Sequence, residues 1–92
     1  VFYHKQSDFT INLNKYFLAQ NVEWQMKDNT LLFYNTLFDS VLFAKPKSEY
    51  LGLSFVKALE NGCADILQLI EETFDQPADS VYSLFVNKKI IE

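Results

Sequence analysis

Histidine, the commonest general acid or base, and cysteine, the strongest side-chain nucleophile, each occur once in this 92-residue chain, as His4 and Cys63. A general base needs a positioned nucleophile and an orienting acid, and His4 lies close to a chain end, so we expect a solvated terminal residue. Cys63 follows Gly62 on an apolar helical stripe, which favours a small core residue. A thiol activated at a helix N-terminus is the alternative.

Metal and cofactor sites are not indicated either. One cysteine and one histidine cannot build a structural zinc site, and no calcium-binding loop is present in the sequence. The only glycines, Gly52 and Gly62, belong to no phosphate-binding motif. Glu71, Glu72 and Asp75 fall within one helical turn, a pattern typical of a solvated face. We therefore expect no catalytic residue, no metal and no cofactor.

The charge pattern restricts the class of partner. All eight positive charges are lysines, against twelve acids, which gives a net charge of −4 and a pI of about 4.8. Binding to nucleic acid or to an anionic membrane is disfavoured, so we expect another protein, neutral or basic, as the partner. Between Lys57 and Lys88 there is no other basic residue, and one face is expected to be negative. The acids of this stretch are Glu60, Asp65, Glu71, Glu72, Asp75 and Asp79.

Cysteine usage and hydropathy predict an intracellular protein, cytoplasmic or nuclear. A lone cysteine forms no internal disulfide, and no run approaches the roughly 18 apolar residues that cross a bilayer. No signal peptide precedes Phe2 and Tyr3, so we expect residues 1–92 to be a single domain cut from a longer chain.

Alternating apolar residues predict a β-hairpin. Val22, Trp24 and Met26 alternate with polar residues, and the return strand spans Thr30 to Asn35. Asp28-Asn29 forms the turn, since both residue types tolerate positive φ.

Two further apolar runs predict strands. Ser40 to Ala44 is continuously apolar, which indicates an interior strand or a sheet covered on both sides, and Pro46 follows its end. Val81 to Val86 is interpreted as the last strand.

Three helices are expected around these strands. A short one spans about Leu13 to Gln20, after an extended approach from Asp8, and a second is capped by Ser48 and stopped by Asn61-Gly62. The third has its apolar residues at helical spacing, namely Cys63, Ile66, Leu67, Ile70 and Phe74. The predicted fold is α+β, with a mainly antiparallel sheet of about four strands and two or three helices packed on one face.

The stretch Asp65 to Glu92 resembles the helix and following strand of ubiquitin-like β-grasp domains. The matching positions are Ile70, Phe74, Pro77, Asp79, Leu84, Phe85, Asn87, Lys88 and Ile90. The resemblance covers about 28 of the 92 residues. It implies a recognition module that presents Tyr82, Leu84 and Val86 to partners; the alternative is that these three residues are core. The chain departs from the family in the extra helix that starts at Ser48, and no terminal Gly-Gly is present.

Aromatic residues are the outlying part of the composition, with nine Phe, five Tyr and one Trp. Most follow an apolar periodicity and are predicted to form a thin core: Phe9, Phe17, Trp24, Phe33, Phe55, Phe74 and Phe85. Tyr34, Phe38, Tyr50 and Tyr82 fit that core less well and are candidate partner-binding residues, together with Leu84 and the acids Glu71, Glu72 and Asp75.

Our leading hypothesis is a noncatalytic interaction or regulatory domain that uses the acidic helix, an aromatic sheet face, or both. The alternative is a small acidic inhibitor of the immunity-protein, antitoxin or nuclease-blocking type, which occupies a basic cleft of its target. A homodimer closed by an exposed apolar patch is also compatible with so many rings on a short chain.

Overall fold

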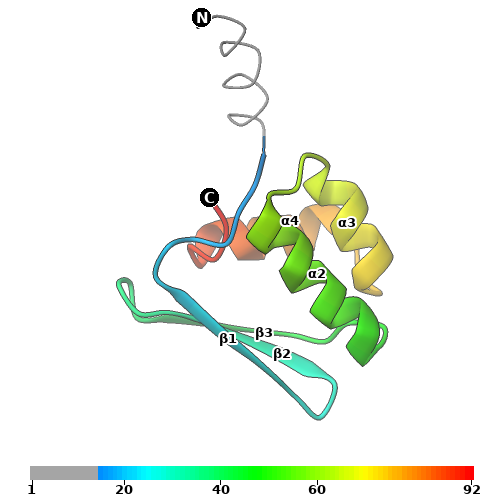
Figure 1. Cartoon of the computed structure of the whole chain (residues 1–92), viewed down its shortest axis with the longest axis horizontal. Coiled ribbons are helices and arrows are strands. Elements are labelled where there is room, and N and C mark those ends of the chain that lie inside the picture. Colours follow the sequence, from blue (N-terminus) through cyan, green and yellow to red (C-terminus); the bar gives the residue numbers. More distant parts are fainter. Residues whose placement is uncertain (1–14) are drawn as a thin grey trace, which may run out of the picture.

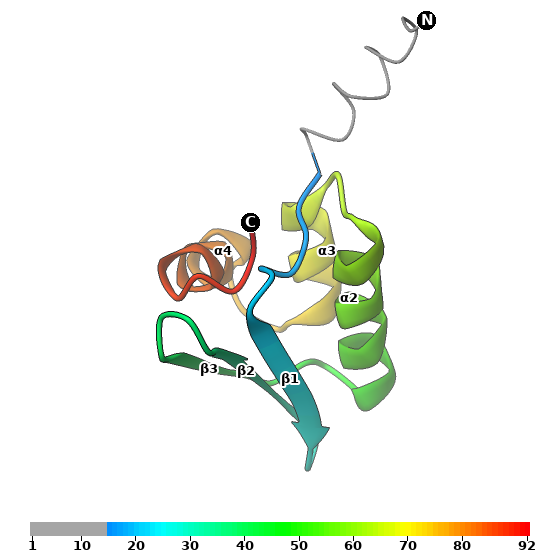
Figure 2. The ribbon, with the colours of Figure 1, turned by 60° about the vertical axis from the view of Figure 1, so that its left-hand side comes forward.

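The computed structural model describes residues 15–92, which form a three-stranded sheet followed by three helices (Figure 1). The elements are β1 Val22–Lys27, β2 Thr30–Asn35, β3 Ser40–Ala44, α2 Glu49–Asn61, α3 Ile66–Thr73 and α4 Ala78–Asn87. The strands are antiparallel in the order β1-β2-β3, and the helices lie on one side of the sheet (Figure 2). The predicted α+β class is confirmed. The interpretations of His4, Phe9 and the approach from Asp8 concern residues outside the described part.

The hairpin of β1 and β2 forms as predicted. Asp28 and Asn29 have φ of 54° and 59°, so the turn has two consecutive left-handed residues. Such a turn twists in the same sense as the strands that it joins. The register pairs Lys27 with Thr30 next to the turn and Trp24 with Phe33 further along.

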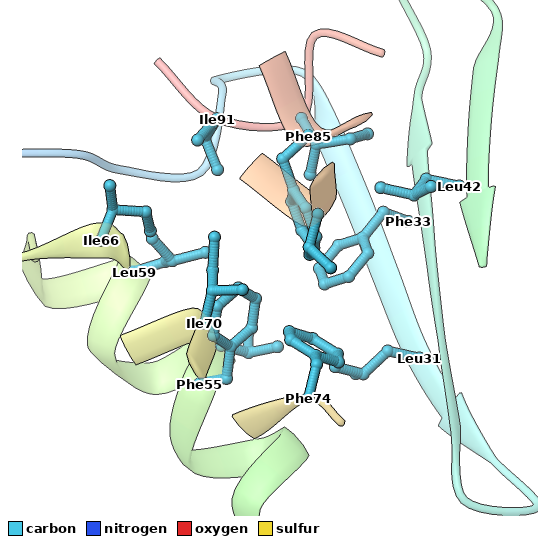
Figure 3. Close-up of a cluster of buried hydrophobic side chains, with 13 residues drawn as sticks. Leu31, Phe33, Leu42, Phe55, Leu59, Ile66, Ile70, Phe74, Phe85 and Ile91 are labelled. Atoms are coloured by element: carbon cyan, nitrogen blue, oxygen red, sulfur yellow. The ribbon is translucent and has the colours of Figure 1, made fainter. Parts of the chain in front are cut away.

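The hydrophobic core lies between the helices and one face of the sheet. Leu31 and Phe33 of β2 and Leu42 of β3 contribute the sheet side of this core. The helical side is contributed by Phe55, Val56, Leu59, Ile66, Ile70, Phe74, Val81 and Phe85. Figure 3 shows these side chains converging from the sheet and from the helices.

Four phenylalanine rings form the centre of this core. Phe55 of α2 contacts Phe33, Phe74 and Phe85 at centroid distances of 6.5, 5.0 and 5.5 Å, in each case edge to face. Phe85 also meets Phe33 at 5.4 Å. The predicted burial of these four rings is confirmed. Phe17 and Trp24, which were also assigned to the core, are 37% and 36% exposed at its margin.

Helices α2 and α3 begin close to where the sequence predicts them. The Ser48 side chain accepts a hydrogen bond from the Leu51 backbone N–H, and α2 ends at Gly62, whose φ is 94°. Asp65 caps α3 in the same way by accepting from the Gln68 N–H. Cys63 therefore precedes α3 instead of belonging to it. These caps satisfy N–H groups that have no partner within the helix.

The strand predicted at Val81 to Val86 is wrong, because these residues belong to α4. Val81 and Phe85 are spaced by four positions, so a helix brings both onto one face, and both are buried. A strand would place them on the same face as well, but it would direct the residues between them to the opposite side. The apolar residues at 81, 82, 84, 85 and 86 are compatible with both periods, and packing against the core selects the helix.

The helix predicted at Leu13 to Gln20 is also wrong for the residues that the structure describes. Residues 15–19 are extended and lie between two other segments, and Gln20 begins a turn. Tyr16 exchanges backbone hydrogen bonds with Cys63 at 2.7 and 2.9 Å. Phe17 does the same with Glu92 at 3.0 and 2.9 Å, and the Ala19 N–H donates to the Ile90 carbonyl. These long-range partners use backbone groups that a helix would have paired locally.

The position of β3 also differs from the prediction. Its continuous apolar sequence indicated an interior strand, whereas β3 lies at the edge of the sheet, next to β2 alone. Leu42 points into the core, while Val41 and Phe43 are 40% and 68% exposed. The described sheet has three strands, because the fourth one expected is α4.

One buried polar residue joins the sheet to the end of α4. Asn35 is 2% exposed, and its Nδ2 donates to the Lys89 carbonyl at 2.7 Å. Its Oδ1 accepts from the backbone N–H groups of Leu37 and Phe38 at 2.9 and 3.1 Å. Asn35 thus fixes both the turn after β2 and the turn that follows α4.

The central position of Phe55 leads to a stability prediction. Phe55→Ala should lower the free energy of unfolding by about 3–5 kcal/mol, because it removes a ring that contacts three others and leaves a cavity. Tyr50→Ala, on the same helix but 76% exposed, should change it by less than about 0.5 kcal/mol. Urea denaturation followed by circular dichroism measures both values. Equal effects of the two substitutions would contradict the packing described.

The hydrogen bonds of Asn35 lead to a second stability prediction. Asn35→Ala should cost about 2–3 kcal/mol, because it leaves the Leu37 and Phe38 N–H groups and the Lys89 carbonyl without their partner. Thr36→Ala removes an exposed side-chain bond to the Asn21 carbonyl and should cost less than about 1 kcal/mol. Thermal and urea unfolding of the two variants provide the comparison, and a cost for Asn35→Ala no larger than that for Thr36→Ala would refute the role assigned to this side chain.

Candidate protein interaction surface

The face of the sheet opposite the helices is uncovered in the described part of the chain (Figure 2). The register places Glu23, Tyr34 and Val41 in one row across the three strands. Gln25, Leu32 and Phe43 form the next row. Side chains alternate along a strand, so these two rows point away from buried Leu31, Phe33 and Leu42. We call these two rows the outer face.

The centre of the outer face is apolar. Leu32 and Tyr34 of β2 are half-buried by their neighbours on β1 and β3, while Phe43 and Val41 on β3 are exposed. Neighbouring side chains in opposed rows are close enough to touch, so the four form a continuous apolar surface. Polar Glu23 and Gln25 border it along β1.

Two shallow hollows follow the outer face. One of about 260 Å³ is lined by Glu23, Trp24, Gln25, Leu32 and Tyr34. The second, of about 330 Å³, is lined by Gln25, Lys27, Asp28, Thr30, Leu32 and Phe43. Because the hollows share Gln25 and Leu32, they are adjacent. Both are open, whereas a small-molecule site encloses most of its ligand. This shape fits side chains of another protein better than an enclosed metabolite.

Charges of opposite sign mark the two ends of the outer face. β1 and β3 run in the same direction, since each is antiparallel to β2. Glu23 and Asp39 therefore lie near the start of these strands, and Lys27 and Lys45 near their ends. The Tyr34 hydroxyl donates to the Asp39 carboxylate at 2.6 Å. That hydrogen bond, followed by the negative charge of Asp39, raises the pKa of Tyr34 above its ordinary value.

The acids predicted to contact a partner lie elsewhere. Glu71 and Glu72 are exposed on α3, and Asp75 is exposed just after it. Glu72 accepts a hydrogen bond from Gln68 at 3.2 Å, and the Lys47 ammonium donates to the Glu71 backbone carbonyl at 3.2 Å. The structure brings these three acids together in the helical layer. It does not bring them together with Tyr34.

Tyr82 and Leu84 lie on a helix instead of on the strand implied by the β-grasp resemblance. Tyr82 is half-buried and its ring meets Tyr16 edge to face at 6.0 Å, with the Tyr82 hydroxyl donating to that of Tyr16 at 3.4 Å. This hydrogen bond raises the pKa of Tyr82. Leu84 is 45% exposed. The two side chains do not form a shared sheet face, and the resemblance carries no further argument.

The remaining two aromatic candidates are exposed but separate. Phe38 lies in the turn between β2 and β3, where the Lys89 ammonium is 5.8 Å from its ring centroid. Tyr50 lies in the first turn of α2, on the helical side of the molecule. Of the four rings singled out from the sequence, Tyr34 is the one on the outer face.

Cys63 lies in a position that suits a structural residue. It is half-buried, and its backbone pairs with Tyr16. Burial raises the pKa of the Cys63 thiol, although a hydrogen bond from the backbone of Asp65 partly offsets this. A raised pKa reduces the thiolate fraction at neutral pH, which is the opposite of what a nucleophile needs.

Among residues 15–92, no group of three or more His, Cys, Asp or Glu side chains could hold a metal ion. Within the same range, no helix has the length and apolarity required to span a membrane. Comparison with protein-family models, with curated proteins and with solved structures finds no match to this chain.

The sequence analysis missed Leu32, Val41 and Phe43 as surface residues. Leu32 could have been found, because side chains alternate along the strand predicted at Thr30 to Asn35, which places Leu32 and Tyr34 on the same face. For Val41 and Phe43, the apolar run of β3 was interpreted as buried on both sides, so their exposure was not expected.

The bond between Tyr34 and Asp39 gives a pH prediction. The pKa of Tyr34 is raised in the folded state. The hydrogen bond therefore contributes its full stability below about pH 10, the ordinary tyrosine pKa, and this contribution is lost as the pH rises through the folded-state pKa of Tyr34. Asp39→Asn should lower the pKa of Tyr34 toward the ordinary value. The carbon resonances of the tyrosine rings, assigned with Tyr34→Phe, report this pKa.

Asp28→Asn is the matched control, since Asp28 also has positive φ but lies in the turn at the other end of the hairpin. It should leave the pKa of Tyr34 unchanged. A shift of equal size in both variants would show that the cause is net charge and not the hydrogen bond.

Proposed function

We propose that this chain is a noncatalytic protein-binding module whose partner contacts the outer face of the sheet. The observation that carries the proposal is the apolar surface formed by Leu32, Tyr34, Val41 and Phe43. Contiguous exposed apolar surface rimmed by polar residues is typical of interaction sites. The exposed ring of Phe43 provides apolar surface that a bound partner would bury.

The chemistry of the surface favours a protein partner over other ligands. The open hollows suit protruding side chains, and Tyr34 offers both a ring and a hydroxyl, as residues at protein interfaces commonly do. The glutamate and lysine at opposite ends of β1 can set the orientation of a partner through charge. The net charge of −4 and the absence of arginine weigh against nucleic acid.

A partner isolated with the wild-type chain should bind at least about tenfold more weakly to Phe43→Asp, because a charge then replaces an aromatic contact at the centre of the interface. Tyr50→Asp is the matched control, as it introduces the same charge at an exposed ring on the helical side. Isothermal calorimetry gives the affinities, and circular dichroism shows that both variants are folded.

The acidic surface of α3 is tested in the same experiment. Glu71→Lys with Glu72→Lys should leave the affinity within about threefold of the wild type at physiological salt, since these residues are remote from the outer face. Loss of binding in this variant, with Phe43→Asp unaffected, would refute the proposal and favour the acidic inhibitor of a basic cleft.

A further inference from the structure

The free edge of β3 has unpaired backbone groups whose direction follows from the hairpin. With a two-residue turn, the flanking residues Lys27 and Thr30 exchange both backbone hydrogen bonds, and the pattern then alternates along the strands. Alternate residues of β2 therefore bond to β1 and to β3 in turn. The bond from the Thr36 N–H to the Asn21 carbonyl, at 2.9 Å, follows the same alternation.

The same alternation continues on β3, where the backbone groups of two residues point away from β2. Phe33 bonds toward β3, so its partner Leu42 bonds inward. The N–H and C=O groups of Val41 and Phe43 then point away from β2. Within the described part of the chain, no backbone group pairs with them. The edge thus has two donors and two acceptors in a row.

β3 also lacks the features that usually protect an edge strand. Natural edges are commonly protected by charged side chains or proline within the strand. Residues 40–44 contain neither, and their sequence is SVLFA. The other edge differs, because β1 carries Glu23 and Lys27 and the Val22 N–H is already used by the Ala19 carbonyl.

We infer that β3 pairs with β3 of a second copy of this chain, antiparallel and centred on Leu42, so that two sheets join into one sheet of six strands. A two-fold axis through the Leu42 pair sets Val41 opposite Phe43 of the second copy, and Phe43 opposite its Val41. Each such pair exchanges two backbone hydrogen bonds, four in total. The inference is independent of the proposed function, which concerns a different partner.

Charge complementarity selects a second copy as the occupant of this edge. Asp39 comes just before β3 and Lys45 just after it, so the antiparallel arrangement brings the Asp39 end of each strand beside the Lys45 end of the other. Two pairs of opposite charge thus flank two pairs of a β-branched and an aromatic residue, and both combinations are favourable across strands. The same axis keeps all helices on one side and makes the two outer faces continuous.

The area available indicates a weak, reversible dimer. Five residues of one strand bury much less than the 1,200–2,000 Å² of a stable interface, so association should be visible only at high concentration. Sedimentation equilibrium of the wild-type chain from about 10 μM to 1 mM should show a monomer–dimer equilibrium. A single monomeric species up to about 1 mM would overturn the inference.

Charge variants test the register. Lys45→Glu faces Asp39 of an identical copy, and Asp39→Lys faces Lys45, so each variant alone should dimerise at least about tenfold more weakly than the wild type. An equimolar mixture restores both opposite pairs and should regain wild-type association as a heterodimer. A mixture no stronger than its components would overturn the register, provided that circular dichroism shows both variants folded.

Salt dependence provides a second readout that needs only Lys45→Glu. Added salt screens charges, so it should weaken the wild-type dimer and strengthen the Lys45→Glu dimer. The same direction of change in both chains would contradict the pairing. Asp39→Lys removes the hydrogen bond that Tyr34 donates to Asp39, and the loss could unfold that variant. The salt dependence of Lys45→Glu tests the register without it.

Backbone pairing is tested separately at Val41. Val41→Pro removes one outward N–H that β2 does not use, and should abolish dimerisation, whereas Val41→Ala keeps it. Equal association of the two variants would exclude edge pairing. Lys45→Glu keeps all four residues of the proposed binding surface and the hydrogen bond between Tyr34 and Asp39, so binding of an external partner to this variant tests the proposed function independently.

Discussion

The structure depends on the contact of four phenylalanine rings. Phe33 comes from the sheet, Phe55 from α2, Phe74 from the end of α3 and Phe85 from α4, so every element that covers the sheet meets at one point. A chain of this length buries only about two thirds of its unfolded surface, and a few dense contacts must replace a large core. All of them lie on one side of the sheet. The described part of the chain therefore supplies no second apolar layer for the other side, and the outer face follows from the way the core is built.

The ends of the elements are fixed by polar groups and not by further packing. Asn35 holds the turn after β2 and the turn that follows α4, because its amide has partners in both. The extended residues 15–19 are held between Cys63 and the segment Ile90 to Glu92 by backbone bonds. Both connections join residues that are more than forty positions apart. They hold the two ends of the described chain beside each other, on the same side of the sheet as the helices (Figure 2).

The sequence predicted correctly those features, a turn and the ends of a helix, that interactions between neighbouring residues determine. The hairpin was predicted because Asp28-Asn29 tolerates positive φ and because Val22, Trp24 and Met26 alternate; Ser48 and Gly62 likewise mark the ends of α2. The two incorrect assignments of helix and strand arose where distant residues decide. Residues 15–19 are extended because Cys63 and Ile90 pair with them, and no pattern within so short a segment contains that information. Residues 81–86 suit either a strand or a helix, and the position of Phe85 against Phe33 and Phe55 decides for the helix.

The candidate surface, too, was predictable only where local patterns in the sequence determine it. Tyr34 was singled out from the sequence, and the alternation of side chains along the predicted strand places Leu32 on the same face. Val41 and Phe43 were assigned to an interior strand, because a strand that is apolar on both faces normally lies between two layers. In this chain one face of β3 is covered by the helices, and the described residues supply no second layer. The apolar run then has the meaning that it has in any sheet, namely burial on both faces, and the partner that we propose for the outer face would supply the cover that residues 15–92 lack.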